Sequence, residues 1–81
     1  MKHKIIAITE NEPGVLYRIA DLFLRRKINI ERLQVAETKT KGVSRFTIVI
    51  DAAPDSVEKL VKQLNRIIEV IDVHATQNGS S

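Results

Sequence analysis

The 81-residue sequence contains no cysteine and no tryptophan, and only three of its residues are aromatic. The absence of cysteine excludes a disulfide framework, a thiolate metal site and a cysteine nucleophile, and it fits a cytoplasmic location. Two histidines, His3 and His74, make a weak case for zinc, which takes three or four protein ligands. We therefore expect this chain to bind no metal and no cofactor.

Long apolar runs are also missing. The longest uninterrupted runs span a few residues, as at 5–8, whereas a membrane helix needs about 20. The apolar run after Met1 is likewise too short for a signal peptide. The net charge is +3, and its one basic cluster, residues 25–27, falls where a helix is expected to end, so that it complements the helix dipole. We expect neither a membrane nor a nucleic acid as partner.

Hydrophobic residues make up 43% of the sequence, which is enough for one core and too many for a disordered chain. A chain of this size buries only about 60–65% of its unfolded surface, so that it is marginally stable alone and gains from pairing. We expect one domain over residues 1–76 and a disordered C-terminal tail over residues 77–81, which are polar.

In the first half of the chain, the hydrophobic pattern predicts two strands and one helix. Apolar residues on both faces of 4–9 favour a central strand. A broad apolar stripe at helical spacing predicts a helix over 15–26. The loose alternation of 28–36 predicts a strand with a β-bulge, and the polar stretch that ends at Gly42 predicts a hairpin turn.

The second half adds two strands and a helix. Residues 43–51 alternate clearly, with Phe46, Ile48 and Ile50 on one face. Asp55 or Ser56 is expected to cap the helix. Its apolar positions recur at helical spacing: Val57, Leu60, Val61, Leu64, Ile67 and Ile68. With a last strand over 70–75, the order is βαββαβ, a ferredoxin-like α+β fold with a four-stranded antiparallel sheet and both helices on one face.

The stretch from Glu10 to Leu16 joins the first strand to the first helix. Pro13 has a preset φ that suits the first turn of a helix, and Gly14 leaves the free amides of the helix start uncovered. Such a helix start is a ready site for a carboxylate or another small anion. The alternative is a simple strand-to-helix turn, which uses Asn, Pro and Gly for conformational reasons alone.

Two other functions find little support in these residues. No serine lies near a histidine in the expected layout, so nucleophilic catalysis is not indicated. RNA-recognition modules share the same element order, but they stack bases on aromatic side chains of the open sheet face. Here Tyr17 and Phe23 belong to a helix and Phe46 to the core face, so no stacking platform remains.

Five segments together resemble the ACT domain, and more narrowly the regulatory (small) subunits of acetolactate synthase, also called acetohydroxyacid synthase. The likeness covers residues 4–73. The segments that carry it are Glu10-Asn11-Glu12-Pro13-Gly14-Val15-Leu16, Ala20-Asp21-Leu22-Phe23, Asn29-Ile30-Glu31, Val43-Ser44-Arg45-Phe46-Thr47-Ile48 and Leu64-Asn65-Arg66-Ile67-Ile68-Glu69-Val70. The first segment marks ACT domains in general, and the second and third strands narrow the likeness to this family.

The resemblance implies a homodimer in which the second strands adjoin in one eight-stranded sheet, with the first helices at the same joint. A branched-chain amino acid, usually valine, would bind there. The ligand-binding residues carried over are Asn11, Gly14, Val15 and Leu16 of one chain with Asn29 and Ile30 of the other. The helix-start amides would receive the carboxylate, the two asparagines would bind either charged end of the ligand, and Ile30 would contact its side chain.

The resemblance also implies a partner. The chain would be a non-catalytic regulatory subunit that activates or feedback-regulates the catalytic large subunit in branched-chain amino-acid biosynthesis. Thiamine diphosphate, magnesium and flavin would belong to that large subunit. Family members commonly carry a second, C-terminal domain, and this sequence ends where that domain would begin. The alternative function is a free-standing ACT-type amino-acid sensor that regulates a different enzyme or regulator.

Overall fold

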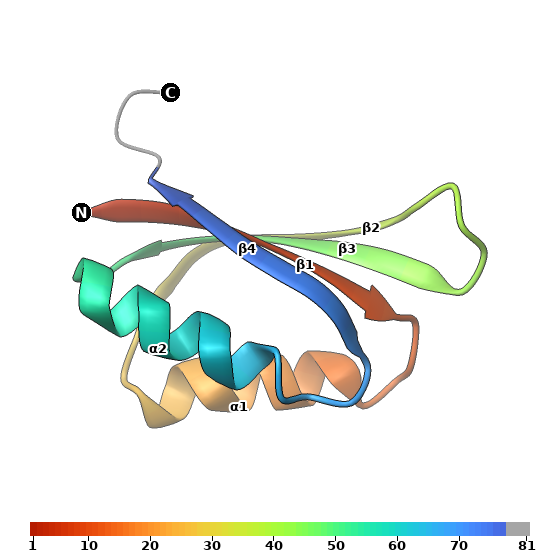
Figure 1. Ribbon diagram of the computed structural model, residues 1–81, viewed down its shortest axis with the longest axis horizontal. Helices are drawn as coiled ribbons and strands as arrows, with labels where there is room; N and C mark the ends of the chain where they lie inside the picture. Colours follow the sequence, from red (N-terminus) through yellow and green to blue (C-terminus); the bar gives the residue numbers. More distant parts are fainter. Residues whose placement is uncertain (78–81) are drawn as a thin grey trace.

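The computed structural model describes residues 1–77 and contains four strands and two helices in the expected order (Figure 1). The elements are β1 (Lys2–Glu10), α1 (Val15–Arg25), β2 (Ile30–Glu37), β3 (Val43–Asp51), α2 (Pro54–Leu64) and β4 (Val70–Gln77). β4 therefore extends one residue past the expected domain boundary at 76. The rest of the expected disordered tail, residues 78–81, lies outside the described residues.

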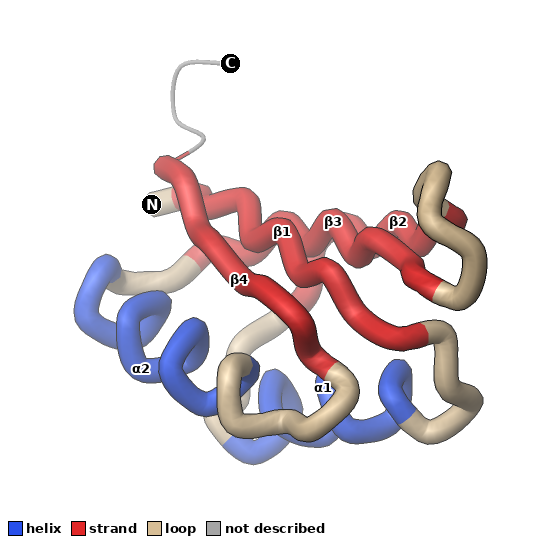
Figure 2. Tube along the Cα trace, turned by 45° about the vertical axis from the view of Figure 1, so that its right-hand side comes forward, coloured by secondary structure: helices blue, strands red, loops and turns tan. Residues whose placement is uncertain are grey.

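The four strands form one antiparallel sheet in the order β2-β3-β1-β4. Both helices cover the same face of the sheet, and within residues 1–77 the other face carries no helix (Figures 1 and 2). This confirms the βαββαβ α+β fold. It also confirms the central position of β1, whose apolar residues on both faces suit a strand that is paired along both of its edges.

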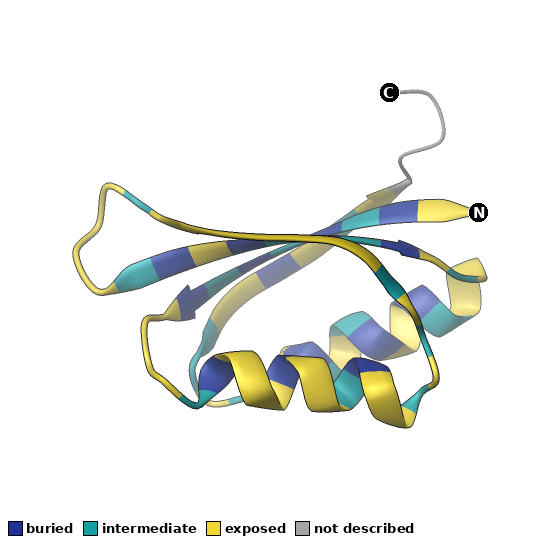
Figure 3. Cartoon of the chain, turned by 180° about the vertical axis from the view of Figure 1, so that it is seen from behind, coloured by how far each residue is buried: buried dark blue, intermediate teal, exposed yellow. Residues whose placement is uncertain are grey.

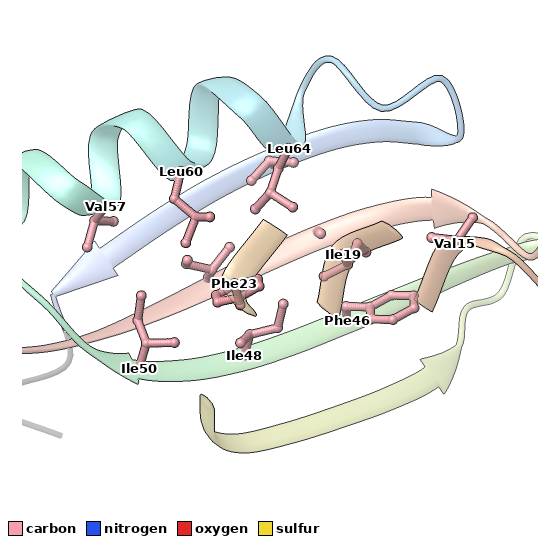
Figure 4. Close-up of a cluster of buried hydrophobic side chains, with 12 residues drawn as sticks. Val15, Ile19, Phe23, Phe46, Ile48, Ile50, Val57, Leu60 and Leu64 are labelled. Carbon is pink, nitrogen blue, oxygen red and sulfur yellow. The ribbon is translucent and has the colours of Figure 1, made fainter. Parts of the chain in front are cut away.

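The hydrophobic core lies between the sheet and the helices (Figure 4). Alternate residues of β1 and β3 point into it because side chains alternate across a strand, and residues three and four apart on each helix meet them. The buried residues of this core are Ile5, Ala7, Val15, Ile19, Phe23, Phe46, Ile48, Ile50, Val57, Leu60, Leu64 and Val73. Every strand except β2 contributes to this set, so the core is built on three of the four strands.

α2 differs from its sequence prediction at both ends. It begins at Pro54 after an N-cap at Ala53, so neither Asp55 nor Ser56 is the cap; proline at the first helical position fits because its φ is preset and its missing amide is not needed there. The helix ends at Leu64. Ile68 is therefore in the α2–β4 loop and exposed. The apolar spacing continued past the helix end because Ile67 still packs against the core from the loop.

The C-terminal end of α1 follows the prediction from the basic cluster. The helix ends at Arg25, and the backbone then turns through Lys27 at a φ of 57°. The amide of Ile28 donates to the carbonyl of Phe23, and the amide of Lys27 donates to that of Leu24. This is the Schellman pattern, in which a residue with positive φ satisfies the last helical carbonyls.

β2 and its hairpin complete the sheet. β2 starts at Ile30 rather than at residue 28, because Ile28 closes the end of α1. Its register against β3 shifts between Ile30 and Arg32, which confirms the predicted bulge. The turn into β3 contains Gly42 at a φ of 79°, a conformation that favours glycine. No helix within residues 1–77 is long and apolar enough to cross a membrane.

Candidate functional site

The turn between β1 and α1 is held from two sides by backbone hydrogen bonds. The amide of Glu10 donates to the carbonyl of Glu69 in the α2–β4 loop at 2.8 Å. The amide of Asn11 donates to the carbonyl of Gly42 in the β2–β3 hairpin, also at 2.8 Å. The predicted ligand turn is therefore positioned by two segments that are far from it in sequence.

Gly14 is the N-cap of α1, with φ −80° and ψ −10°, and no side chain in the described part of the chain caps the helix start. A methyl group added at Gly14 would have the guanidinium of Arg18 as its nearest neighbour, at 3.9 Å. Neither space nor backbone conformation therefore requires glycine here. The amide of Val15 donates to the carbonyl of Glu12 within the turn at 3.1 Å, whereas the amides of Gly14 and Leu16 meet no acceptor in the described part of the chain.

The six predicted site residues fall into two groups at opposite ends of α1 (Figure 1). Asn11, Gly14 and Leu16 lie at or near the surface at its N-terminal end, where the side chain of Val15 is buried in the core. Asn29 and Ile30 follow its C-terminal end. Eleven helical residues separate the groups by about 16 Å, so one chain alone does not bring them together.

A cavity of about 370 Å³ opens between the β1–α1 turn and the β2–β3 hairpin. It is lined by Asn11, Glu37, Thr38, Thr40, Lys41, Gly42 and Val43. Sequence reasoning treated residues 38–42 only as a turn and missed their place beside Asn11. The signal that would have found them is the strand pairing, since Glu10 lies directly opposite Val43.

Two hydroxyl side chains lie in the sheet layer close to this turn. Thr9 and Ser44 are direct partners in the β1–β3 register, and both are buried. The Oγ1 atom of Thr9 has no hydrogen-bond partner within residues 1–77. These two hydroxyl groups make the end of the core next to the turn polar, and an unpaired buried hydroxyl there costs free energy.

An ion pair joins α1 to the α2–β4 loop next to the turn. The guanidinium of Arg18 donates to a carboxylate oxygen of Glu69. This hydrogen bond is the main reason that the pKa of Glu69 is lowered, and it also raises the pKa of Arg18. Sequence reasoning missed Arg18, although it lies one helical turn after Gly14 and adds positive charge near the helix start.

An apolar surface remains uncovered beside α1. Leu33 and Val35 of β2 lie directly opposite the core residues Ile48 and Phe46, and so on the same face, yet they are 39% and 51% exposed. Leu16, Tyr17 and Leu24 of α1 are exposed as well. Figure 3 shows nearly all of β2 exposed and running past α1. We call these five residues the α1–β2 surface.

Spacing along the helix shows which side of α1 carries this surface. Leu16 and Leu24 lie eight residues apart on one stripe. Arg18 and Arg26 face the other way, because they bond to Glu69 and Gln63 in the second half of the chain. The exposed stripe of α1 therefore faces away from α2. Within residues 1–77, no group of three or more His, Cys, Asp or Glu side chains is placed to hold a metal ion.

Comparison with known proteins gives one consistent family. The model of the AHAS small subunit-like ACT domain matches residues 5–72. The probable acetolactate synthase small subunit of Archaeoglobus fulgidus is 51% identical over 80 residues, which are 99% of this chain and 50% of that protein. The acetolactate synthase small subunit of Mycobacterium avium is 44% identical over 79 residues, 98% of this chain and 47% of that protein.

A solved structure agrees. The crystal structure of the acetolactate synthase small subunit from Thermotoga maritima superposes with a TM-score of 0.87 at 31% identity, covering 99% of this chain and 50% of that one. The ACT domain from the GTP pyrophosphokinase of Chlorobium tepidum, at 17% identity and a TM-score of 0.77, shares the fold. The chain spans about half the length of the curated relatives that it matches.

Proposed function

Because this chain belongs to the family of AHAS small subunit-like ACT domains, we propose that it is a non-catalytic regulatory chain. It binds a branched-chain amino acid, with valine as the first candidate, at the joint of a homodimer, and it regulates the catalytic subunit of acetolactate synthase in the cytoplasm. The observation that carries the proposal is the division of the six predicted ligand residues between the two ends of α1.

The homodimer is supported by the α1–β2 surface. β2 is an edge strand, so among residues 1–77 half of its backbone groups have no partner in the sheet. A two-fold axis beside β2 pairs two such edges antiparallel into one eight-stranded sheet and sets the two α1 helices antiparallel. The N-terminal end of one α1 then lies beside the C-terminal end of the other. This is the arrangement that joins Asn11, Gly14 and Leu16 to the partner's Asn29 and the partner's Ile30.

The chemistry of the two groups suits a zwitterionic apolar amino acid. The uncapped start of α1 offers amides of Gly14 and Leu16 to a carboxylate. An asparagine side chain both donates and accepts, so Asn11 and Asn29 suit either charged end. Ile30 and Leu16 supply apolar contacts for a branched side chain. Val15 contributes by holding α1 on the core, because its side chain is buried and its amide is engaged within the turn.

The catalytic partner is supported by the names of the relatives, which are small subunits of acetolactate synthase. In this proposal, the thiamine diphosphate, magnesium and flavin of the reaction are bound by the large subunit, and this chain binds none of them. Regulation then depends on contact between two chains, with the amino acid as the signal.

Titration calorimetry with valine tests the effector site. We expect one valine per site to bind the dimer and to raise its melting temperature, since a ligand of the folded state stabilises it. Gly14→Asp should abolish this binding with little loss of stability, because it adds a negative charge where the ligand carboxylate is expected, whereas the backbone at Gly14 accepts a side chain. Gly14→Ala is the matched control for added bulk without charge. Full valine binding by Gly14→Asp would place the carboxylate site elsewhere.

Co-purification with the acetolactate synthase large subunit of the same organism tests the partner. We expect a stable complex with higher synthase activity than that of the large subunit alone. An effector-binding dimer that neither binds nor activates the large subunit would favour the free-standing amino-acid sensor instead.

A further inference from the structure

The ion pair between Arg18 and Glu69 uses only part of the guanidinium group. The Nη1 atom of Arg18 donates to the Oε2 atom of Glu69. The other carboxylate oxygen of Glu69, Oε1, is buried and has no partner within residues 1–77. A bidentate pair would engage two guanidinium nitrogens and both carboxylate oxygens. Because this pair is a single bond, it leaves the Nη2 and Nε donors of Arg18 for another acceptor.

The Nη2 atom of Arg18 lies beside the start of α1. It is 3.9 Å from the position that a Cβ atom at Gly14 would take. Residues four apart share one side of a helix, and helical side chains point toward the N-terminal end, so Arg18 reaches back to the turn. The side chain of Arg18 is 55% exposed, so a ligand has access to it. A carboxylate bound to the free amides at this helix start would therefore lie next to a guanidinium nitrogen.

The charge of the β1–α1 turn makes such a cation necessary. Glu10 and Glu12 are both exposed, and residues 10–14 contain no basic residue. These carboxylates oppose the approach of a ligand carboxylate, and the helix start offers only a partial positive charge against them. Lys41 also lies near Asn11, but it shares the lining of the hairpin cavity with Glu37, whose charge is opposite. Arg18 is therefore the better placed source of a full positive charge.

We propose that Arg18 binds the carboxylate of the effector amino acid through Nη2, while Nη1 keeps its hydrogen bond to Glu69. The inference deepens the proposed function and rests on it, since it adds a charged contact to the same effector site. Hydrogen bonds between ionised groups are stronger than those between neutral groups. Arg18 thus makes the site specific for ligands with a free carboxylate, which backbone amides alone distinguish less strongly from a neutral amide.

This contact also fixes the orientation of the ligand. Gly14 and Arg18 lie on one side of α1, whereas Leu16, two residues from each, lies on the opposite side. The side of Leu16 carries the exposed apolar stripe that the proposed dimer covers. The carboxylate of the amino acid therefore points toward Arg18, and its apolar side chain points toward Leu16 and the dimer joint.

Titration calorimetry with L-valine on two charge-removing variants tests the contact. Arg18→Gln removes the charge beside the helix start, and Arg66→Gln, at an exposed position of the α2–β4 loop, removes an equal charge nearby. We expect Arg18→Gln to weaken valine binding by about 10-fold or more, as for a lost hydrogen bond to a charged group, whereas Arg66→Gln leaves it unchanged. Full valine binding by Arg18→Gln would overturn the inference and leave the proposed function standing. A parent protein that binds no branched-chain amino acid would overturn both.

Glu69→Gln separates a contact with the ligand from support of the turn. If Arg18 acts only by holding the α2–β4 loop against the turn, Arg18→Gln and Glu69→Gln should both weaken valine binding. If Arg18 contacts the carboxylate, Glu69→Gln removes a negative charge that offsets the cation, so valine should bind about 2–3-fold more tightly. The amide oxygen of glutamine still accepts a hydrogen bond from Nη1. Opposite signs for the two variants support the proposal, and weaker binding by both would overturn it.

L-Valinamide tests the same contact from the side of the ligand, because a neutral amide replaces the carboxylate. We expect the parent protein to prefer L-valine over L-valinamide, and we expect Arg18→Gln to reduce this preference by about 10-fold. The change in preference measures the coupling between Arg18 and the carboxylate, as in a double-mutant cycle. A structural role of Arg18 would weaken both ligands equally. An unchanged preference in Arg18→Gln would therefore overturn the inference.

Discussion

The two halves of the chain, β1–α1–β2 and β3–α2–β4, have the same order of elements but leave their edge strands in different states. α2 packs against β4, and Val73 of that strand is buried in the core. α1 packs against α2 instead of over β2, and Leu33 and Val35 stay exposed although they are in phase with the core. One half covers its edge strand within a single chain, whereas the other half leaves the apolar side chains of its edge strand exposed.

The difference arises from the offset of the helix layer relative to the sheet. Here the helices lie over β1, β3 and β4, the strands that supply the buried core residues. The strand left over, β2, has charged residues near both ends and an apolar middle. Such a strand tolerates water in the free chain and still offers apolar contacts to a partner.

The largest contrast should be seen in a matched pair of truncations across β2 and β3. Ile48 and Leu33 lie directly opposite each other, but only Ile48 is fully buried. We expect Ile48→Ala to cost about 2–5 kcal/mol of unfolding free energy at any protein concentration. Leu33→Ala should cost much less in dilute solution, with a loss that grows as concentration favours the dimer. Urea unfolding at two concentrations measures both. Equal costs in dilute solution would mean that β2 is part of the core of the single chain.

A charge on β2, in the α1–β2 surface, should separate the subunits of the proposed dimer. We expect Val35→Lys to weaken the dimer by about 100-fold, because edge lysines oppose strand pairing and desolvation of a charge is costly. Ile68→Lys, in the exposed α2–β4 loop, is the control and should leave the dimer intact. Sedimentation equilibrium at tens of micromolar decides between them. A dimer that survives Val35→Lys and dissociates on Ile68→Lys would move the interface to the other half.

The end of α1 and the interior of α2 also respond differently to glycine. Lys27 has a φ of 57° after α1, so Lys27→Gly should stabilise the fold by about 1 kcal/mol by removing the strain of a side chain in that conformation. Lys59→Gly, inside α2, should destabilise it by about 1 kcal/mol. Thermal unfolding of both variants checks the two signs. A loss of stability on Lys27→Gly would mean that the lysine side chain makes a contact that outweighs the strain.

The smallest effect should be the pH dependence of the ion pair that holds the turn to the second half. The pKa of Glu69 is lowered from its ordinary value of 4.5, first by the hydrogen bond from Arg18. A lowered folded-state pKa stabilises the fold above the unfolded pKa, and this contribution disappears as the pH falls through the folded value. Glu69→Gln should therefore be slightly less stable than the parent at pH 7. When the pH falls below 4.5, the variant should lose less stability than the parent does, because it has no carboxylate to protonate. The melting temperatures of the parent and the variant at pH 7 and pH 3 measure this effect. An equal drop in both proteins would mean that the ion pair does not contribute to stability.

Local pattern determined most of the secondary structure. The strict alternation of β3 and the helical stripe of α1 predicted these elements closely because each depends on neighbours along the chain. The bulge in β2 and the hairpin glycine followed from the same kind of signal. The resemblance to acetolactate synthase small subunits also came from the sequence, through segments whose spacing the fold preserves.

Only the tertiary structure decided which strand stays uncovered, where α2 ends and which residues meet. Leu33 and Val35 alternate as a buried strand does, and their exposure follows from the order of the strands and the position of α1. The division of the predicted ligand residues between the two ends of α1 and the Arg18–Glu69 ion pair both depend on how distant segments lie in space. Spacing along the chain determines the face on which a residue lies, whereas the path of the chain through space determines what lies against that face.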